Sequence, residues 1–315
     1  MSELEDATTL CILGCGNLGT AILTNLIEPT PSNADPLPFT NFIACVRSEK
    51  SEQALKHRFP SPPQNLTISR GSNTAAVQSA SVIILAADPA DIPSLLAAPG
   101  LRDALAGKLL ISVAAGWTRP ALETTLYGTA TTAANRRAEN RAWIIRTLPN
   151  IAALAAAGLT AIEVDDDAAA AAAANHATHL DLTTAIFSRV GRTLRVAPRH
   201  MDAATALAGS TPAFFAVICD ALVDAGVAVG VPRDQASAMI FQAMAGTAAM
   251  LNDGVHPGVL KDRGTSPEGC TIGGLMVMEE GGVRGTVGRA LREAVTVARL
   301  MGREGGAGHV NDTVR

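Results

Sequence analysis

The sequence has few aromatic residues and no dense patch of positive charge. Phe, Trp and Tyr make up 3% of its 315 residues, and the formal net charge is −4. Base stacking needs aromatic side chains, and nucleic-acid backbones and anionic lipids need clustered Lys and Arg. We therefore expect neither nucleic acid nor a membrane surface as a partner.

The sequence also lacks a long apolar run, a secretion signal and a recognisable cysteine framework. No purely apolar run reaches the roughly 18 residues of a spanning helix, and the N-terminal segment MSELEDATTL is acidic. The five cysteines follow no zinc-ligand spacing. These features predict a cytoplasmic protein without a membrane span, a disulfide framework or a metal site.

Short apolar segments alternate with helical patterns in the first two thirds of the chain. The predicted strands are 8–14, 41–47, 65–69, 81–87, 109–116, 143–150, 160–164 and 192–197. The predicted helices between them include one beginning near Asn17 and those at 72–79, 119–127 and 166–190. This β-α-β order predicts an α/β fold with a Rossmann-like, doubly wound and mostly parallel sheet.

After residue 198 the sequence predicts helices only. The clearest are 211–226, 233–251 and 285–301. Helices that are apolar all round are buried, and so few charged faces indicate that a second subunit covers them. We therefore predict a dinucleotide-binding domain over residues 1–197 and an all-helical dimerisation and substrate domain over residues 198–315.

The segment CILGCGNLGTAI follows the first predicted strand and begins the first predicted helix. Gly14, Gly16 and Gly19 have the spacing of a dinucleotide-binding loop, in which glycines allow a tight turn, close approach of the pyrophosphate and close helix packing. The helix N-terminus adds partial positive charge for the phosphates. The segment therefore predicts a dinucleotide site.

The residues after the second predicted strand indicate which dinucleotide is used. An NAD site usually has Asp or Glu there to bind the ribose hydroxyls, whereas this chain has Arg47 and Ser48. A guanidinium pairs well with a 2′-phosphate. We predict NADP(H) as the cofactor, and the nearby Glu49 keeps NAD(H) open as the alternative.

Several segments, in order along residues 10–301, resemble the pyrroline-5-carboxylate reductase family. Among them are GCGNLGTAI, ISVAAGWT, RTLPNIAALAAAGLTAI and the long HPGVLKDRGTSPEGCTIGGLMVMEEGGVRGTV. The resemblance implies a Rossmann-like domain and a helical domain that interlocks with a partner's to form a homodimer, often assembled into a higher oligomer. It also implies reduction of the cyclic imine 1-pyrroline-5-carboxylate to proline, the last step of proline biosynthesis, with NADPH or NADH.

The resemblance also implies which residues form the site. The implied cofactor-binding residues are Gly14, Cys15, Gly16, Asn17, Leu18, Gly19, Arg47, Ser48, Asn73, Ala86, Ala87, Asp88, Pro89, Ala114, Ala115 and Gly116. The implied substrate-binding residues are Ser266, Glu268, Gly269, Cys270 and Thr271. Arg263, just upstream, is a further substrate-binding candidate, which would either reach the substrate or pair with Glu268. In the family, backbone amides of the segment 266–271 bind the substrate carboxylate, and a threonine hydroxyl, here that of the catalytic candidate Thr271, faces the ring nitrogen. A hydroxyl is a poor acid, so we expect Thr271 chiefly to orient the imine.

The chain departs from the family pattern at several positions around the implied site. Glu268 stands where the family has glycine, and its carboxylate would repel a substrate carboxylate. The other departures are Arg263 for Asn or Gln, Pro198 for a frequent glutamate, Ala208 and Thr211 for Ser and Gly, and Asp88 for lysine. Two alternatives therefore stay open: a paralogous reductase of another cyclic imine in secondary metabolism, and a nucleotide-binding member without catalysis.

Overall fold

The computed structural model describes residues 9–28, 36–60, 65–130, 140–164 and 174–301. These residues belong to two compact units. The first comprises Met1–Gly209 with Val295–Arg315, and the second comprises Ser210–Ala294. The boundary predicted between residues 197 and 198 stays a prediction.

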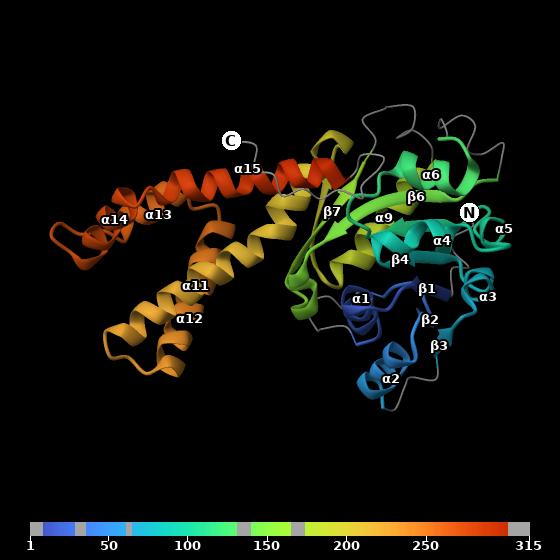
Figure 1. Cartoon of the computed structure of the whole chain (residues 1–315), viewed down its shortest axis with the longest axis horizontal. Helices are drawn as coiled ribbons and strands as arrows, with labels where there is room; N and C mark the ends of the chain where they lie inside the picture. Colours follow the sequence, from blue (N-terminus) through green and yellow to red (C-terminus); the bar gives the residue numbers. More distant parts are fainter. Residues whose placement is uncertain (1–8, 29–35, 61–64, 131–139, 165–173, 302–315) are drawn as a thin grey trace. The chain divides into compact units, whose positions relative to one another are not determined.

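An eight-stranded sheet forms the centre of the first unit (Figure 1). Its strands are β1 (Thr9–Leu13), β2 (Asn41–Val46), β3 (Leu66–Arg70), β4 (Val82–Leu85), β5 (Leu109–Ser112), β6 (Trp143–Pro149), β7 (Gly158–Glu163) and β8 (Gly191–Val196). Their order is β3-β2-β1-β4-β5-β6-β7-β8, and only β6 and β7 pair antiparallel among the described strands. The predicted doubly wound, mostly parallel sheet is therefore confirmed.

Helices cover both faces of this sheet (Figure 1). They are α1 (Asn17–Ile27), α2 (Glu49–Arg58), α3 (Asn73–Gln78), α4 (Ile92–Leu96), α5 (Leu101–Ala104), α6 (Arg119–Tyr127) and α9 (Ala174–Ser188). Successive side chains of a strand point to opposite faces. Accordingly, Leu10 and Ile12 of β1 join the core beneath α1, α2 and α9, whereas Cys11 and Leu13 join the core beneath α3 to α6.

Every element described between residues 198 and 301 is helical, as predicted. A short 3-10 helix, Pro198–His200, and a π-helical segment, Thr205–Ser210, flank α10 (Met201–Ala204), and the longer helices follow. They are α11 (Thr211–Ala228), α12 (Arg233–Asn252), α13 (Pro257–Arg263), α14 (Cys270–Glu280) and α15 (Val283–Met301).

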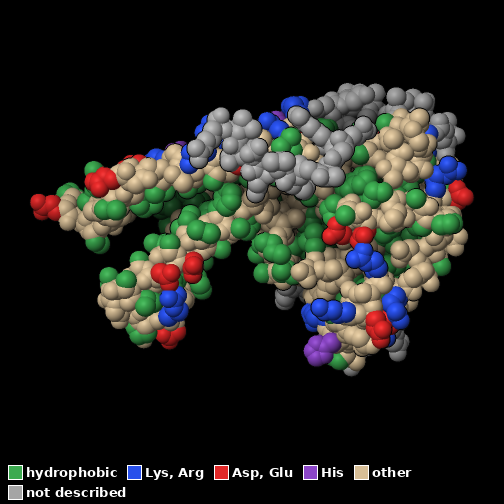
Figure 2. Space-filling model, in the orientation of Figure 1, with side chains coloured by type: hydrophobic (Ala, Val, Ile, Leu, Met, Phe, Trp, Pro, Cys, Tyr) green, Lys and Arg blue, Asp and Glu red, His purple; other side chains and the backbone are tan. Residues whose placement is uncertain are grey.

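The helices of the second unit expose large apolar side chains within a single chain. Val217 is 70% exposed, Val277 67% and Met239 62%. Figure 2 shows hydrophobic side chains on the surface of these helices. By length and composition the helical run Pro198–Ala228 could also cross a membrane, but one run of this kind is weak evidence for a span.

His179 lies on α9 in the core of the first unit. Its ring centroid is 5.1 Å from that of Trp143, and its Nδ1 atom has no hydrogen-bond partner among the described residues. Burial, together with the charge of His176, lowers the pKa of His179 to about 4. The folded protein therefore holds this imidazole in its neutral form.

We predict that the free energy of unfolding falls as the pH drops from about 6.5 toward 4, because the unfolded chain takes up a proton on His179 that the folded chain refuses. The contribution of His179 is fully present above pH 6.5 and is lost as the pH falls through this window, at no more than about 1.4 kcal/mol per pH unit. Urea unfolding between pH 6.5 and 5 should show that the free energy of unfolding depends less steeply on pH in His179→Gln than in the unmodified protein. An equally steep dependence of the free energy of unfolding on pH in His179→Gln would contradict the prediction.

Candidate functional site

A cavity of about 540 Å³ lies where the strand order reverses between β1 and β4. Ligands of open α/β sheets bind at this position, outside the carboxyl ends of the strands. Nine of the predicted cofactor residues line the cavity: Gly14, Cys15, Gly16, Arg47, Ser48, Asn73, Ala86, Ala87 and Asp88. The structure thus brings together residues from four separate segments of the chain.

The three glycines of the loop meet three different steric demands. Gly14 has φ +99°, and a Cβ there would lie 2.6 Å from the Cα of Ala87. A Cβ at Gly19 would lie 2.3 Å from the Gly14 carbonyl oxygen. At Gly16 a Cβ would meet nothing within 4 Å, so this residue borders open space. The first and third glycines allow close packing, and the second leaves the backbone accessible.

Not every amide of this loop is available to a ligand. The N–H groups of Gly14 and Cys15 both donate to the Cys45 carbonyl oxygen, over 3.1 and 2.9 Å. No side chain caps α1, whose N-cap is Gly16. The leading amides of a helix have no partner within the helix, so the first turn of α1 offers the donors for an anion.

Arg47 and Ser48 follow β2 at the rim of the same cavity. Ser48 is the N-cap of α2 and accepts a hydrogen bond from the Ser51 N–H over 3.1 Å. Arg47 forms an ion pair with Asp91, which ends the short helix Pro89–Asp91 after β4. Asn73, another lining residue, begins α3. The structure therefore places a guanidinium where the sequence predicts a 2′-phosphate, but the guanidinium already has a partner.

The loops after β4 and β5 are tied together by Trp117, which the sequence analysis did not single out. Its Nε1 donates to the Pro89 carbonyl oxygen over 3.1 Å. Asp88 accepts a hydrogen bond from the Ala90 N–H over 2.9 Å and so caps the helix that begins at Pro89. An acidic side chain where the family pattern has lysine therefore has a local structural use.

The remaining predicted cofactor residues lie outside this cavity. Asn17 lines a neighbouring cavity of about 630 Å³, which Cys15 and Gly16 also border. Neither cavity is lined by Leu18, Gly19, Pro89, Ala114, Ala115 or Gly116. Leu18 and Gly19 lie in the first turn of α1, and residues 114–116 follow β5.

The predicted substrate residues lie together in the second unit, at and after the end of α13. The Gly269 N–H donates to the Ser266 carbonyl oxygen over 3.1 Å, closing a turn in which Glu268 has φ +58°. A positive φ at the third position and proline at the second are features of a type II turn. Thr271 is exposed in the first turn of α14, which no side chain caps.

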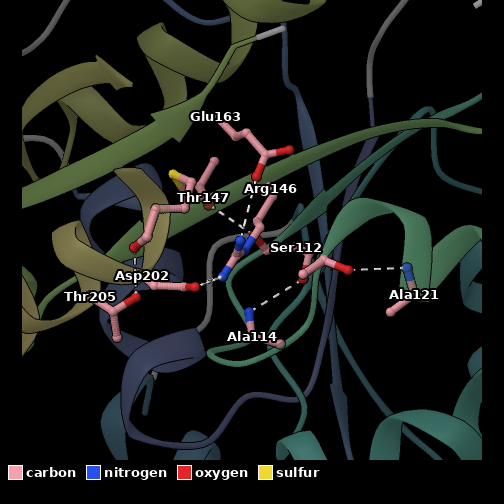
Figure 3. Close-up of polar contacts among 10 residues, drawn as sticks. Ser112, Ala114, Ala121, Arg146, Thr147, Glu163, Asp202 and Thr205 are labelled. Carbon is pink, nitrogen blue, oxygen red and sulfur yellow. Dashed lines mark hydrogen bonds and ion pairs between the residues drawn. The ribbon is translucent and has the colours of Figure 1, made fainter. Parts of the chain in front are cut away.

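A buried arginine at β6 is the functional candidate that the sequence analysis missed (Figure 3). Arg146 has 3% of its side chain exposed and forms ion pairs of 3.5 Å with Glu163 of β7 and Asp202 of α10. Its Nε atom has no hydrogen-bond partner among the described residues. The sequence did contain a signal for Arg146, because a charged residue inside an apolar, buried strand must have a paired charge or hydrogen-bond partner.

The same cluster holds the loop after β5. Arg146 is in register with Ser112 of β5, and the hydroxyl of Thr147 donates to the Ser112 carbonyl oxygen over 3.1 Å. The Ser112 hydroxyl in turn accepts a hydrogen bond from the Ala114 N–H over 3.3 Å (Figure 3). These contacts fix the start of the segment 114–116, which the family resemblance implies as part of the cofactor site.

The fold and the cavity define a Rossmann-like α/β protein with a helical C-terminal region. Residues 198–301 match a family model for pyrroline-5-carboxylate reductase dimerisation, and residues 9–116 match one described as NADP oxidoreductase, coenzyme F420-dependent. A pyrroline-5-carboxylate reductase of Lophium arboricola is 40% identical over 97% of this chain and 96% of its own, and one of Neurospora crassa is 38% identical with the same coverage. The chain belongs to the pyrroline-5-carboxylate reductase family.

Two solved structures share the fold of this chain. The pyrroline-5-carboxylate reductase of Coxiella burnetii has a TM-score of 0.74 at 25% identity, covering 94% of this chain and 99% of its own. The Plasmodium falciparum pyrroline carboxylate reductase with NADP bound shares the fold, with a TM-score of 0.74 at 22% identity over 95% of this chain and 99% of its own. The match to a dimerisation model supports a homodimer.

We predict that Arg146→Met lowers the free energy of unfolding by about 3 kcal/mol, because it leaves two carboxylates without their shared buried cation. Urea unfolding measures the loss. Arg146→Met combined with Glu163→Gln should recover part of it, because one of those charges is then gone. Arg195→Met, which breaks the exposed pair of Arg195 with Asp181, should cost less than about 1 kcal/mol. Equal losses in the free energy of unfolding at positions 146 and 195 would show that the buried cluster stabilises the fold no more than an exposed ion pair does.

Proposed function

We propose that this protein reduces 1-pyrroline-5-carboxylate to proline with NADPH and so acts in proline biosynthesis. The observation that carries the proposal is one cavity lined both by Gly16, the N-cap of the uncapped helix α1, and by Arg47, in a chain of the pyrroline-5-carboxylate reductase family. Relatives bearing that name match it at up to 40% identity over 97% of the chain.

The residues of the cavity fit a phosphorylated dinucleotide. Amides at the start of α1 suit the pyrophosphate. Arg47 suits a 2′-phosphate, and the Ser48 and Asn73 side chains supply hydrogen-bonding groups beside it. Gly16 leaves room for phosphate oxygens, since a Cβ there would meet no other atom within 4 Å. When bound, NADPH supplies the hydride that reduces the C=N bond.

The remaining task of the protein is to hold the imine in one orientation and to assist protonation of its nitrogen. The amides at the start of α14 suit a substrate carboxylate, because that helix also lacks a side-chain cap. Thr271 lies in the same turn, and its hydroxyl would donate a hydrogen bond to the ring nitrogen as the imine becomes an amine. Its main contribution is orientation, because the bound imine is reactive only in a narrow range of geometries.

The homodimer is proposed as the working unit, with assembly into a higher oligomer as its extension. The apolar faces of α11, α12 and α14 are the surfaces that a partner would cover. We propose the cytoplasm as the compartment, because the five cysteines are free and a reducing environment keeps them so.

The activity is tested by the rate of NADPH oxidation with a panel of cyclic imines. Pyrroline-5-carboxylate should give the highest kcat/KM, above pyrroline-2-carboxylate, piperideine-carboxylates and the uncharged 1-pyrroline. A higher value for another member of the panel would instead favour the paralogous reductase. Tight NADPH binding with no turnover of any imine would identify a non-catalytic member.

We predict that Thr271→Val lowers kcat by about 100-fold, because it removes the hydrogen bond that orients the ring nitrogen of the imine for hydride transfer. The dissociation constant for NADPH should change little. Thr247→Val is the matched control in the same unit; its hydroxyl donates to the Ala243 carbonyl oxygen on α12, over 2.8 Å. Full turnover in Thr271→Val, with Thr247→Val equally active, would remove Thr271 from the mechanism.

A further inference from the structure

The charge balance of the cofactor cavity is negative. Among the described residues that line it, Arg47 is the one cation, and Asp88 and Asp91 are the acids. An NADPH site has to accommodate a 2′-phosphate that carries up to two further negative charges. The distribution of the two acidic groups around Arg47 therefore bears on which cofactor binds better.

The two acids have different partners. Asp88 uses its Oδ1 atom to cap the helix that follows it. Asp91 instead contacts the guanidinium of Arg47 through its Oδ2 atom. The Arg47 side chain is 81% exposed and that of Asp91 38% exposed, so the pair lies at the rim, where an incoming nucleotide can compete for it. The backbone of Asp91 is held separately, since its carbonyl oxygen accepts a hydrogen bond from Ser94 Oγ over 2.9 Å.

We propose that Asp91 is a cofactor-specificity residue, which competes with the 2′-phosphate for Arg47 and so weakens binding of NADPH relative to NADH. The inference rests on the proposed function, in which Arg47 receives that phosphate. To bind NADPH, the guanidinium must leave Asp91 or be shared between two anions, which repel each other. NADH presents only uncharged ribose hydroxyls at this position, and so its binding carries no such cost.

Two other roles for Asp91 predict changes of opposite sign. If Asp91 pre-orients Arg47 for the phosphate, its removal weakens NADPH binding. If Asp91 accepts hydrogen bonds from the ribose hydroxyls, as an acid after the second strand does in NAD sites, its removal weakens NADH binding. Each of these outcomes overturns the proposal.

The test is Asp91→Asn, with the dissociation constants of NADPH and NADH measured by titration of the full chain without an imine. We expect NADPH to bind about fivefold more tightly and NADH to change less than about twofold. The gain should shrink at high ionic strength, because salt screens an exposed pair. Asp91→Ser, which also removes the charge, should give the same shift. An unchanged ratio of the two constants in both variants would overturn the proposal.

Two controls separate this inference from the proposed function. Asp181→Asn makes the same substitution in the Arg195–Asp181 pair, which lines neither described cavity, and should leave both constants unchanged. Arg47→Ala should weaken NADPH more than NADH, and should reduce the effect of Asp91→Asn when the two are combined. Equal losses for both nucleotides in Arg47→Ala would refute the 2′-phosphate contact itself. A selective loss there, with no effect of Asp91→Asn, would refute the role of Asp91 alone.

Discussion

The close contact between Gly14 and the backbone of Ala87 is the constraint on which the cavity between β1 and β4 depends. The two residues follow β1 and β4, neighbouring strands between which the chain passes through β2 and β3. A side chain at Gly14 would begin 2.6 Å from Ala87 and would force the two loops apart. Gly19 adds a second constraint. Because a Cβ at Gly19 would clash with the carbonyl oxygen of Gly14, α1 can approach that oxygen only if residue 19 is glycine. The first turn of α1 is thereby fixed at the edge where the carboxyl ends of the strands meet.

The central strands could be predicted because burial on both faces leaves a local signal. Residues 82–85, the whole of β4, are fully buried, and the corresponding run of the sequence is entirely apolar. Helix α2 gave no such signal, since Leu55 is its one buried residue. Its stabilising features are instead the Ser48 cap, acidic residues in the first turn and basic residues in the last. Helix α14 contains Gly273 and Gly274, which are poor helix formers. Local propensity therefore disfavours a helix in this segment.

The candidate site could be proposed from the sequence where one short segment contains its residues, and could not be where residues from distant segments meet. The glycine loop and Arg47 could be read from local spacing. The partner of Arg47 is 44 residues away, and Trp117 reaches back 28 residues to Pro89. Such pairings follow from the strand order, which composition does not reveal. Arg146 was an intermediate case, because the sequence shows a charge inside a buried strand but does not identify the two acids that neutralise it.

The backbone at Glu268 shows how the predicted substrate loop can change its charge while keeping its shape. The turn needs a positive φ at this residue, which glycine adopts freely and glutamate adopts at a cost of about 1 kcal/mol. The turn nevertheless closes with the bond from the Gly269 N–H to the Ser266 carbonyl oxygen, so the start of α14 keeps its place. A Cβ at Gly269 would lie 2.4 Å from Ser266 Oγ, so a larger residue there would require the Ser266 side chain to move. The effect of Glu268 on an anion that approaches α14 is therefore electrostatic rather than conformational.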